Sequence, residues 1–237
     1  MAEMATTKRK APPTADAPKQ NILVIDVGGT NLKLIDSNHA EPLKIPSGTT
    51  MTAARMVEEV RNATKDWGCT AISMGYPGPV VNGKLLAEPH NLGPGWIDMD
   101  FEKELGLPIR IVNDAAMQAL GGYDGGRMLF LGLGTGLGSA LIIDGVLAPM
   151  ELAHLPYRKG KTFEQYLGIR ALEKLGKAKW LEHVFIVIDM LRKALVADYV
   201  VLGGGNSKKI KELPEGVKLG ANSNAFQGGF RLWTDYK

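Results

Sequence analysis

The feature that most narrows the possible folds is a pair of glycines, Gly28 and Gly29, set directly behind an apolar run in IDVGGTN, residues 25–31. Residues 21–27 are rich in Ile, Leu and Val, as in a buried strand, and apolar character resumes at Leu32–Ile35. The pattern therefore predicts two strands joined by a tight turn. Glycines can take positive φ and let an anion approach backbone N–H groups. The turn can therefore bind phosphate, with an ordinary hairpin turn as the alternative.

Two polar side chains flank these glycines. Asp26 precedes them and can orient a hydrated Mg²⁺, a cation that prefers oxygen ligands. Thr30 follows them and adds a hydroxyl donor. The chemistry of the turn is that of a phosphate and metal cradle built largely from backbone.

Composition and charge limit the possible partners. The 237 residues are 45% hydrophobic and 22% charged, which is typical of a soluble protein with a sizeable core. The net charge of +3 owes much to Lys8, Arg9, Lys10 and Lys19, so no nucleic-acid partner is predicted. Residues 1–20 hold little to bury and are expected to form a disordered tail.

No targeting or membrane segment is predicted. The first residues lack the apolar core of a signal peptide, and no window of 18 apolar residues exists. The single cysteine, Cys69, excludes an internal disulfide and a multi-cysteine zinc site. This cysteine content suits a reducing cytoplasm, where we expect the protein to act.

The spacing of apolar residues predicts the elements of the first half. We expect strands over 21–27, 32–35, 43–46, 70–75 and 109–112, and helices over 52–67, 100–105 and 115–120. The order indicates a mixed sheet with a crossover helix. Residues 76–96 are rich in proline and glycine and are expected to form a long functional loop.

The second half begins with another strand, turn and strand. We expect strands over 127–133, 139–144 and 199–202, and helices over 163–175 and 179–196. Ser207 is predicted to cap a helix that carries Lys208, Lys209 and Lys211. A closing helix over 224–233 is predicted to be interrupted by Gly228 and Gly229.

The second turn lies in LGLGTGLGSA, residues 131–140, with glycine at every second position from Gly132 to Gly138. A dinucleotide fingerprint needs a helix after its glycines, but the residues that follow are strand-like, so that interpretation fails. The remaining interpretations are a turn whose backbone meets an anion and a glycine-rich hairpin without a ligand.

Two further patterns carry polar side chains suited to sugar chemistry. Asn113 and Asp114 end a predicted strand, where Asp114 can act as a general base and Asn113 can hold a neighbouring hydroxyl. The alternative is that Asp114 only caps the next helix. Glu151 and His154 can supply an acceptor and a donor to sugar hydroxyls.

With these elements in order, the chain resembles the ROK family of sugar kinases and repressors. The resemblance runs from Asn21 to Trp233 and rests on DVGGTN, GYPGPV, NLGPGW, VNDAA, LGLGTGLGSALIIDG, ELAH and VVLGGG. It implies an α/β fold of two ribonuclease-H-like domains of the actin/hexokinase-like ATPase type, with a cleft between them. We expect domains over 21–116 and 117–237, with the last helix able to pack back on the first domain.

The resemblance also implies residue roles. The phosphate-binding residues would be Asp26, Gly28, Gly29, Thr30, Asn31, Lys33, Gly134, Thr135 and Gly136. Asp114 would be the catalytic base towards the 6-hydroxyl of a hexose, and the sugar would be held by Asn91, Asn113, Asp114, Glu151, His154 and Glu164. Gly203, Gly204 and Gly205 would border the adenosine of a nucleotide, and Asp26 would contact Mg²⁺ indirectly.

The chain departs from the family pattern in two places. Residues 155–163, LPYRKGKTF, lack the cysteine cluster with which many members bind zinc, so no zinc is predicted. Only about twenty residues precede the first strand, too few for the helix-turn-helix of the repressor members. A DNA-binding repressor is therefore disfavoured, and the homodimer common in the family is expected.

The leading hypothesis is phosphoryl transfer to glucose or a close hexose, with Mg²⁺, and the rival is a non-catalytic sugar sensor. The glycines of VVLGGG favour ATP as donor. A polyphosphate donor needs a basic track, for which the candidates are Lys33, Arg158, Lys159, Lys161, Lys208 and Lys209. The alternative for these side chains is a solvated charged surface.

Overall fold

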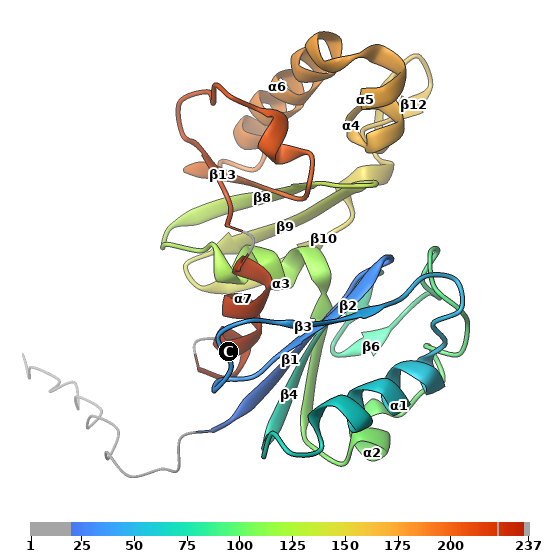
Figure 1. Cartoon of the computed structure of the whole chain (residues 1–237). Coiled ribbons are helices and arrows are strands. Elements are labelled where there is room, and N and C mark those ends of the chain that lie inside the picture. The colour runs from blue at the N-terminus through green and yellow to red at the C-terminus, as the bar shows by residue number, and fades with distance from the viewer. Residues whose placement is uncertain (1–19, 222, 235–237) are drawn as a thin grey trace, which may run out of the picture.

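The computed structural model describes residues 20–221 and 223–234, so the predicted tail lies outside the described part apart from Gln20. Two five-stranded mixed sheets lie one above the other in Figure 1, with helices α3 and α7 between them. This is the mixed α/β architecture that the sequence predicts. None of the helices in the described ranges has both the length and the apolar character needed to cross a bilayer.

The first sheet has the strand order β3-β2-β1-β4-β7. Its strands are β1 Ile22–Val27, β2 Asn31–Ile35, β3 Leu43–Pro46, β4 Ala71–Tyr76 and β7 Ile109–Asn113. β1, β2 and β3 are antiparallel neighbours, whereas β4 is parallel to β1 and β7 is parallel to β4. The predicted crossover helix is confirmed as α1, Ala53–Thr64, with the Thr52 side chain accepting a hydrogen bond from the Arg55 N–H as N-cap.

The second sheet has the strand order β10-β9-β8-β13-β14. Its strands are β8 Arg127–Leu133, β9 Leu137–Ile143, β10 Val146–Met150, β13 Tyr199–Gly203 and β14 Val217–Leu219. The edge strands β10 and β14 were not predicted, because neither has the buried apolar alternation of a central strand. Pro149 is tolerated in β10 because an edge strand needs fewer N–H donors.

Helices cover the outer face of the second sheet (Figure 1). They are α4 Glu164–Leu167, α5 Ile169–Leu175 and α6 Lys177–Ala194, preceded by η1 Leu152–His154 and the hairpin of β11 Pro156–Arg158 and β12 Lys161–Thr162. The single helix predicted over 163–175 is wrong. Gly168 is extended and breaks it, and a Cβ there would lie 2.7 Å from the Thr135 carbonyl oxygen.

Two further predictions are wrong, one of a long loop without strands and one of a helix. Residues 76–96 contain the hairpin of β5 Val80–Val81 and β6 Lys84–Leu85, closed by Asn82 and Gly83, which both have positive φ. Asn-Gly is a strong hairpin signal. The helix predicted after Ser207 is only the 3₁₀ turn η2, Ser207–Lys209, because the chain becomes extended at Ile210, a residue that is buried in the core of the second half.

The closing helix α7, Asn224–Thr234, is continuous, so its predicted interruption is also wrong. It packs on α3, Asp114–Gly121, and a Cβ on Gly228 would overlap the carbonyl oxygen of Met117. Glycine here allows two helix backbones to touch. The Ser73 hydroxyl on β4 donates to the Gly229 carbonyl oxygen at 2.6 Å, which ties α7 to the first sheet. The division into domains at residue 116 stays a prediction.

Candidate active site

The first glycine turn joins β1 to β2. Gly28 donates its N–H to the Asn31 carbonyl oxygen at 3.2 Å. Contrary to the prediction, neither Gly28 nor Gly29 has a positive φ. Glycine is needed at both positions because another part of the chain lies too close to leave room for a Cβ. A Cβ on Gly28 would lie 2.7 Å from the Asn31 carbonyl oxygen, and one on Gly29 would lie 3.2 Å from the Asn91 Cβ. The loop that carries Asn91 therefore lies against this turn.

A serine that the sequence analysis missed holds the same turn. Ser47 donates its hydroxyl to the Gly28 carbonyl oxygen at 2.6 Å and its N–H to the Thr30 carbonyl oxygen at 3.0 Å. These bonds fix the orientation of two peptide groups in the turn. Nothing in the motif pattern marks Ser47, because it lies beyond β3 in the chain.

Asp26 and Lys33 form an ion pair beside this turn. They are directly opposite each other in the antiparallel register of β1 and β2. The Lys33 Nζ lies 2.7 Å from the Asp26 Oδ2, and Asp26 is buried. The strand pairing therefore explains why two predicted phosphate-site residues meet, with the lysine neutralising the carboxylate.

The second glycine turn joins β8 to β9. Gly134 donates its N–H to the Gly136 carbonyl oxygen at 3.1 Å. Asn206, which the sequence analysis missed, donates its side-chain N–H to the Gly134 carbonyl oxygen at 2.9 Å. Gly204 has a φ of +78° and packs against Leu133. The segment with Gly203, Gly204 and Gly205 thus lies against the second turn.

Glu164 contacts this turn directly. A Cβ on Gly136 would overlap the Glu164 Oε2 atom, so glycine leaves room for the carboxylate. The Ile169 N–H donates to the Thr135 carbonyl oxygen at 3.2 Å, across the break at Gly168. The break between α4 and α5 therefore allows both helices to support the second turn.

Asn113, rather than Asp114, is the N-cap of α3. Its Oδ1 accepts hydrogen bonds from the N–H groups of Ala115 at 2.9 Å and Ala116 at 3.2 Å. Its side-chain N–H donates to the Gly78 carbonyl oxygen at 3.0 Å. The interpretation of Asp114 as a simple cap is therefore wrong. The three hydrogen bonds of the Asn113 side chain use both acceptor positions of its oxygen and one of its two amide N–H groups, which leaves one N–H for a ligand.

Asp114 begins α3 between the two sheets. A Cβ on Gly75 of β4 would lie 3.5 Å from the Asp114 Cα, and one on Gly138 of β9 would lie 2.7 Å from the Ala115 Cβ. Small residues on both sheets therefore admit the start of α3. They bring Asp114 close to strands from both halves of the chain.

Carboxylates from both halves interact at this point. Burial, and then the negative charges of Asp26 and Glu151, raise the pKa of the Asp114 carboxyl to about 7, against hydrogen bonds from backbone N–H groups. Burial also raises the pKa of Glu151, which nearby His154 lowers and Glu164 raises. The structure thus brings Asp26, Asp114, Glu151, His154 and Glu164 into one electrostatic cluster.

A second missed serine holds Glu151 in this cluster. The buried Ser139 hydroxyl donates to the Met150 carbonyl oxygen at 2.8 Å and accepts from the Leu152 N–H at 3.2 Å. One hydroxyl thereby fixes the backbone on both sides of Glu151. Ser139 lies inside the second glycine motif, which is the only signal that could have pointed to it.

The predicted basic track is distributed over three elements. Lys33 lies on β2, Arg158, Lys159 and Lys161 lie on the exposed hairpin of β11 and β12, and Lys208 and Lys209 lie on η2. Arg158 also lies over the ring of Tyr157 at 5.2 Å. Lys33 alone among these six forms an ion pair with another residue of the predicted site.

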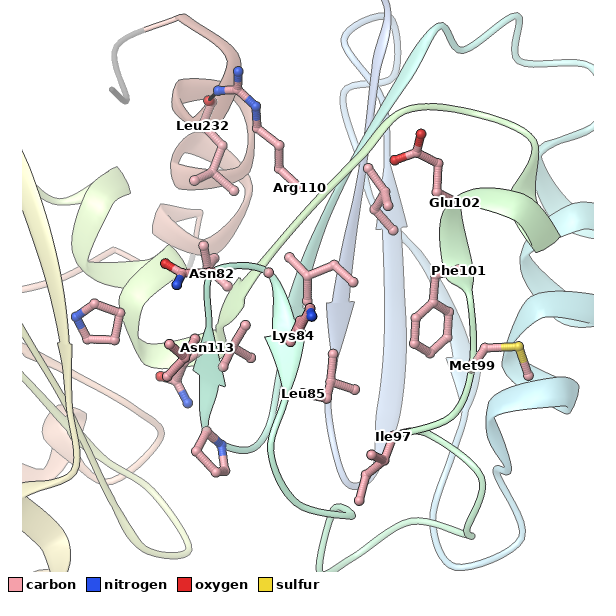
Figure 2. Close-up of a pocket in the computed structure, with 18 of the residues that line it drawn as sticks. Asn82, Lys84, Leu85, Ile97, Met99, Phe101, Glu102, Arg110, Asn113 and Leu232 are labelled. Carbon is pink, nitrogen blue, oxygen red and sulfur yellow. Dashed lines mark hydrogen bonds between the residues drawn. The ribbon is translucent and has the colours of Figure 1, made fainter.

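A wide groove of about 1170 Å³ borders the cluster. Figure 2 shows Lys84 and Leu85 of the β5–β6 hairpin on one side and Met99 and Phe101 on the other. Of the predicted site residues, the groove includes only Asn113 and Glu151. The glycine turns lie outside it, so the groove adjoins the cluster without containing it.

Two curated proteins are similar to this chain in sequence. Polyphosphate glucokinase from Mycobacterium leprae (strain TN) is 29% identical over 233 residues, covering 86% of this chain and 70% of that protein. The enzyme of the same name from Mycobacterium tuberculosis (strain ATCC 25618 / H37Rv) is 29% identical over 209 residues, covering 81% of this chain and 74% of that protein.

Solved structures share the fold. The inorganic polyphosphate/ATP-glucomannokinase from Arthrobacter sp. strain KM superposes with a TM-score of 0.74 at 23% identity, over 89% of this chain and 96% of that one. A ROK family glucokinase from Streptomyces griseus, in complex with glucose and AMPPNP, has a TM-score of 0.66 at 16% identity, over 88% and 97%.

The family model described as the ROK family matches residues 22–149, more than half of the 237 residues. The matched range contains both glycine turns and, between them in sequence, Asp114. The chain therefore belongs to the ROK family.

Proposed function

We propose that this protein is a hexose kinase that transfers a phosphoryl group to the 6-hydroxyl of glucose or a close hexose. The observation that carries the proposal is the position of Asp114 at the start of α3, where burial and then the charges of Asp26 and Glu151 raise the pKa of its carboxyl to about 7. A group with a pKa near neutrality is well suited to accept a hydroxyl proton. The names of the relatives, polyphosphate glucokinase and polyphosphate/ATP-glucomannokinase, support the same reaction class.

In this proposal the sugar lies between the two halves of the cluster. Asn91, Asn113, Glu151, His154 and Glu164 hold its hydroxyls, and Asp114 accepts the proton of the hydroxyl that attacks. The two turns, with Asp26, Asn31, Lys33 and Thr135, hold the donor phosphates. Positioning and electrostatic stabilisation supply most of the rate enhancement in phosphoryl transfer, which fits a site built from backbone turns and a base.

The residues of the first turn fit Mg²⁺. Asp26 offers a buried carboxylate whose charge is balanced by Lys33, and Mg²⁺ prefers carboxylate oxygens, water and phosphate. When bound, the ion would neutralise donor phosphates, and Asp26 would hold it through water. Lys33, which pairs with Asp26, would add positive charge beside the donor phosphates.

The donor is ATP, polyphosphate or both. The packing of Gly204 on the backbone of Leu133, directly before the second turn, supports a nucleotide donor, because it places a glycine backbone beside the proposed phosphate site. The exposed basic residues of the β11–β12 hairpin and η2 support a longer polyanion. A homodimer and a cytoplasmic location belong to the same proposal, supported by the family resemblance and the single cysteine.

A coupled assay with glucose, mannose, fructose, N-acetylglucosamine and N-acetylmannosamine, each with ATP and with polyphosphate, tests the function. We expect turnover with glucose or a close hexose and with at least one donor. A salt series separates the donors, because a polyanion bound by several lysines should lose affinity more steeply with salt. Sugar binding without turnover on either donor would contradict the kinase and favour the sensor.

The raised pKa of Asp114 predicts a pH dependence. The general base must be ionised, so kcat/KM for the sugar should fall about tenfold per pH unit below a pKa near 7 and level off above it. The measurement is a pH–rate profile at saturating donor, with stability checked at each pH. A flat profile between about pH 5 and pH 8 would contradict the role of Asp114 as base.

A further inference from the structure

The loop between β6 and α2, Phe101–Leu105, contains an unusual carboxylate site. The Glu88 carboxylate accepts hydrogen bonds from three consecutive N–H groups, those of Gly95 at 3.3 Å, Trp96 at 3.1 Å and Ile97 at 3.3 Å. Gly95 has a φ of +93°, which turns its N–H towards those that follow. Successive N–H groups arranged in this way form a concave anion site. The anion here is a side chain of the same loop.

The loop is also tied to the rest of the first half. The Gly93 N–H donates to the Met51 carbonyl oxygen at 2.9 Å, and the Tyr76 hydroxyl donates to the Ala87 carbonyl oxygen at 2.8 Å. The fully buried Trp96 donates its indole N–H to the Gly93 carbonyl oxygen at 2.8 Å. Glu88 therefore joins the two arms of a loop whose base is anchored in the core.

Asn91 lies between those two arms. A Cβ on Gly29 would lie 3.2 Å from the Asn91 Cβ, so the loop brings Asn91 to the first glycine turn. Asn91 is exposed, and its position depends on the path of residues 89–94. The hydrogen bonds of Glu88 connect the two ends of this segment, because they join residue 88 to residues 95–97.

We infer that Glu88 is a positioning residue that holds Asn91 in place to bind the sugar. The inference rests on the proposed function, in which Asn91 is a sugar ligand. An ionised carboxylate suits the task because it only accepts hydrogen bonds, and all three partners are donors. Glu88 is itself exposed, so its removal leaves no cavity in the core. Its effect on the sugar can therefore be separated from an effect on folding.

The test compares Glu88→Ala and Glu88→Gln with Glu41→Gln. Glu41 is an exposed glutamate that makes no hydrogen bond or ion pair with the described residues. Glu88→Ala should raise the KM for glucose by about tenfold or more and leave the donor KM within about twofold, because a shift of about 1 Å in a positioning group has large effects. The KM for glucose of Glu88→Gln should lie between those of wild type and Glu88→Ala, because the glutamine amide retains one acceptor oxygen. Glu41→Gln should match wild type.

Two measurements distinguish positioning from a general structural effect. Because Glu88 acts through Asn91, Glu88→Ala should add little to the glucose KM of Asn91→Ala, and a double-mutant cycle measures this coupling. Amide hydrogen exchange over residues 95–97 should become faster in Glu88→Ala, with no change in the strands of either sheet. Neither readout is expected from a variant that is only less stable.

The failures of the two proposals are distinguishable. Wild-type protein that neither binds nor phosphorylates any hexose would contradict the proposed function. A wild-type kinase whose glucose KM is unchanged by Glu88→Ala, or whose glucose and donor KM rise equally, would overturn only the role of Glu88. Additive effects of Glu88→Ala and Asn91→Ala would overturn it as well.

Discussion

Replacing Asp114 with asparagine is expected to lower the turnover number of hexose phosphorylation by about 10²–10⁴, the usual contribution of a general base. The two side chains have nearly the same shape, but the amide cannot accept the proton of the attacking hydroxyl. Sugar affinity should stay within about threefold, because the other sugar ligands remain. Steady-state kinetics for turnover and calorimetry for sugar binding measure the two quantities separately.

The matched control is Asp66→Asn, which changes an exposed carboxylate in the segment between α1 and β4 that makes no hydrogen bond or ion pair with the cluster. It should retain wild-type kinetics. An Asp114→Asn variant with near-normal turnover would contradict the assignment of the base. Loss of sugar binding together with turnover would assign Asp114 to binding instead.

The Asp114→Asn variant should become more stable relative to wild type as the pH rises. The folded pKa of Asp114, about 7, lies above the ordinary carboxyl value of 3.8. Protonated Asp114 therefore favours the folded state below that ordinary value, and this contribution is lost as the pH rises through 7. Asparagine does not ionise and so has no such loss. The free energy of unfolding of Asp114→Asn should therefore exceed that of wild type by roughly 1–4 kcal/mol above neutral pH, at about 1.4 kcal/mol per pKa unit. Denaturant unfolding at several pH values measures it.

Replacing Gly228 with alanine is expected to lower the free energy of unfolding by about 3 kcal/mol or more, the upper range for overpacking a core. A Cβ at this position would overlap the Met117 carbonyl oxygen, so α3 and α7 would have to separate. The sign of this stability change is informative, because helix propensity alone favours alanine over glycine by about 1 kcal/mol. An isolated helix would gain stability, whereas this helix pair should lose it.

Gln227→Ala is the control for this change, since Gln227 is the exposed neighbour of Gly228 on the same helix. It should change stability by less than about 0.5 kcal/mol, as surface substitutions usually do. Thermal and denaturant unfolding compare the variants. A Gly228→Ala protein as stable as wild type would show that α3 and α7 do not pack backbone to backbone.

Much of the fold could be predicted because its signals are local. The apolar run before Gly28, the spacing along α1 and the strand-turn-strand order of β8 and β9 depend on neighbouring residues. The wrong predictions occurred where a contact with a residue distant in sequence decides whether a helix breaks or continues. Gly168 breaks a helix because it meets Thr135, and Gly228 lies in an uninterrupted helix because it meets Met117.

The site shows the same division. Asp26, Asp114 and Glu151 stand out in the sequence because carboxylates beside glycines and strand ends suit phosphate and sugar chemistry. Ser47, Glu88 and Ser139 do not stand out, because each acts on the backbone of residues that lie far away in the chain or across a loop. Such hydrogen bonds leave no periodic pattern that a sequence analysis can detect.

The sequence by itself therefore determined the two glycine turns, the order of most elements and the carboxylates that the chemistry requires. Only the tertiary structure decided how these parts meet. The register of β1 and β2 pairs Asp26 with Lys33, and the start of α3 lies where burial, and then carboxylates from both halves, raise the pKa of Asp114. The physical reason is that hydropathy and turn preference are properties of neighbouring residues, whereas close approach and charge interaction depend on distances that only the folded chain sets.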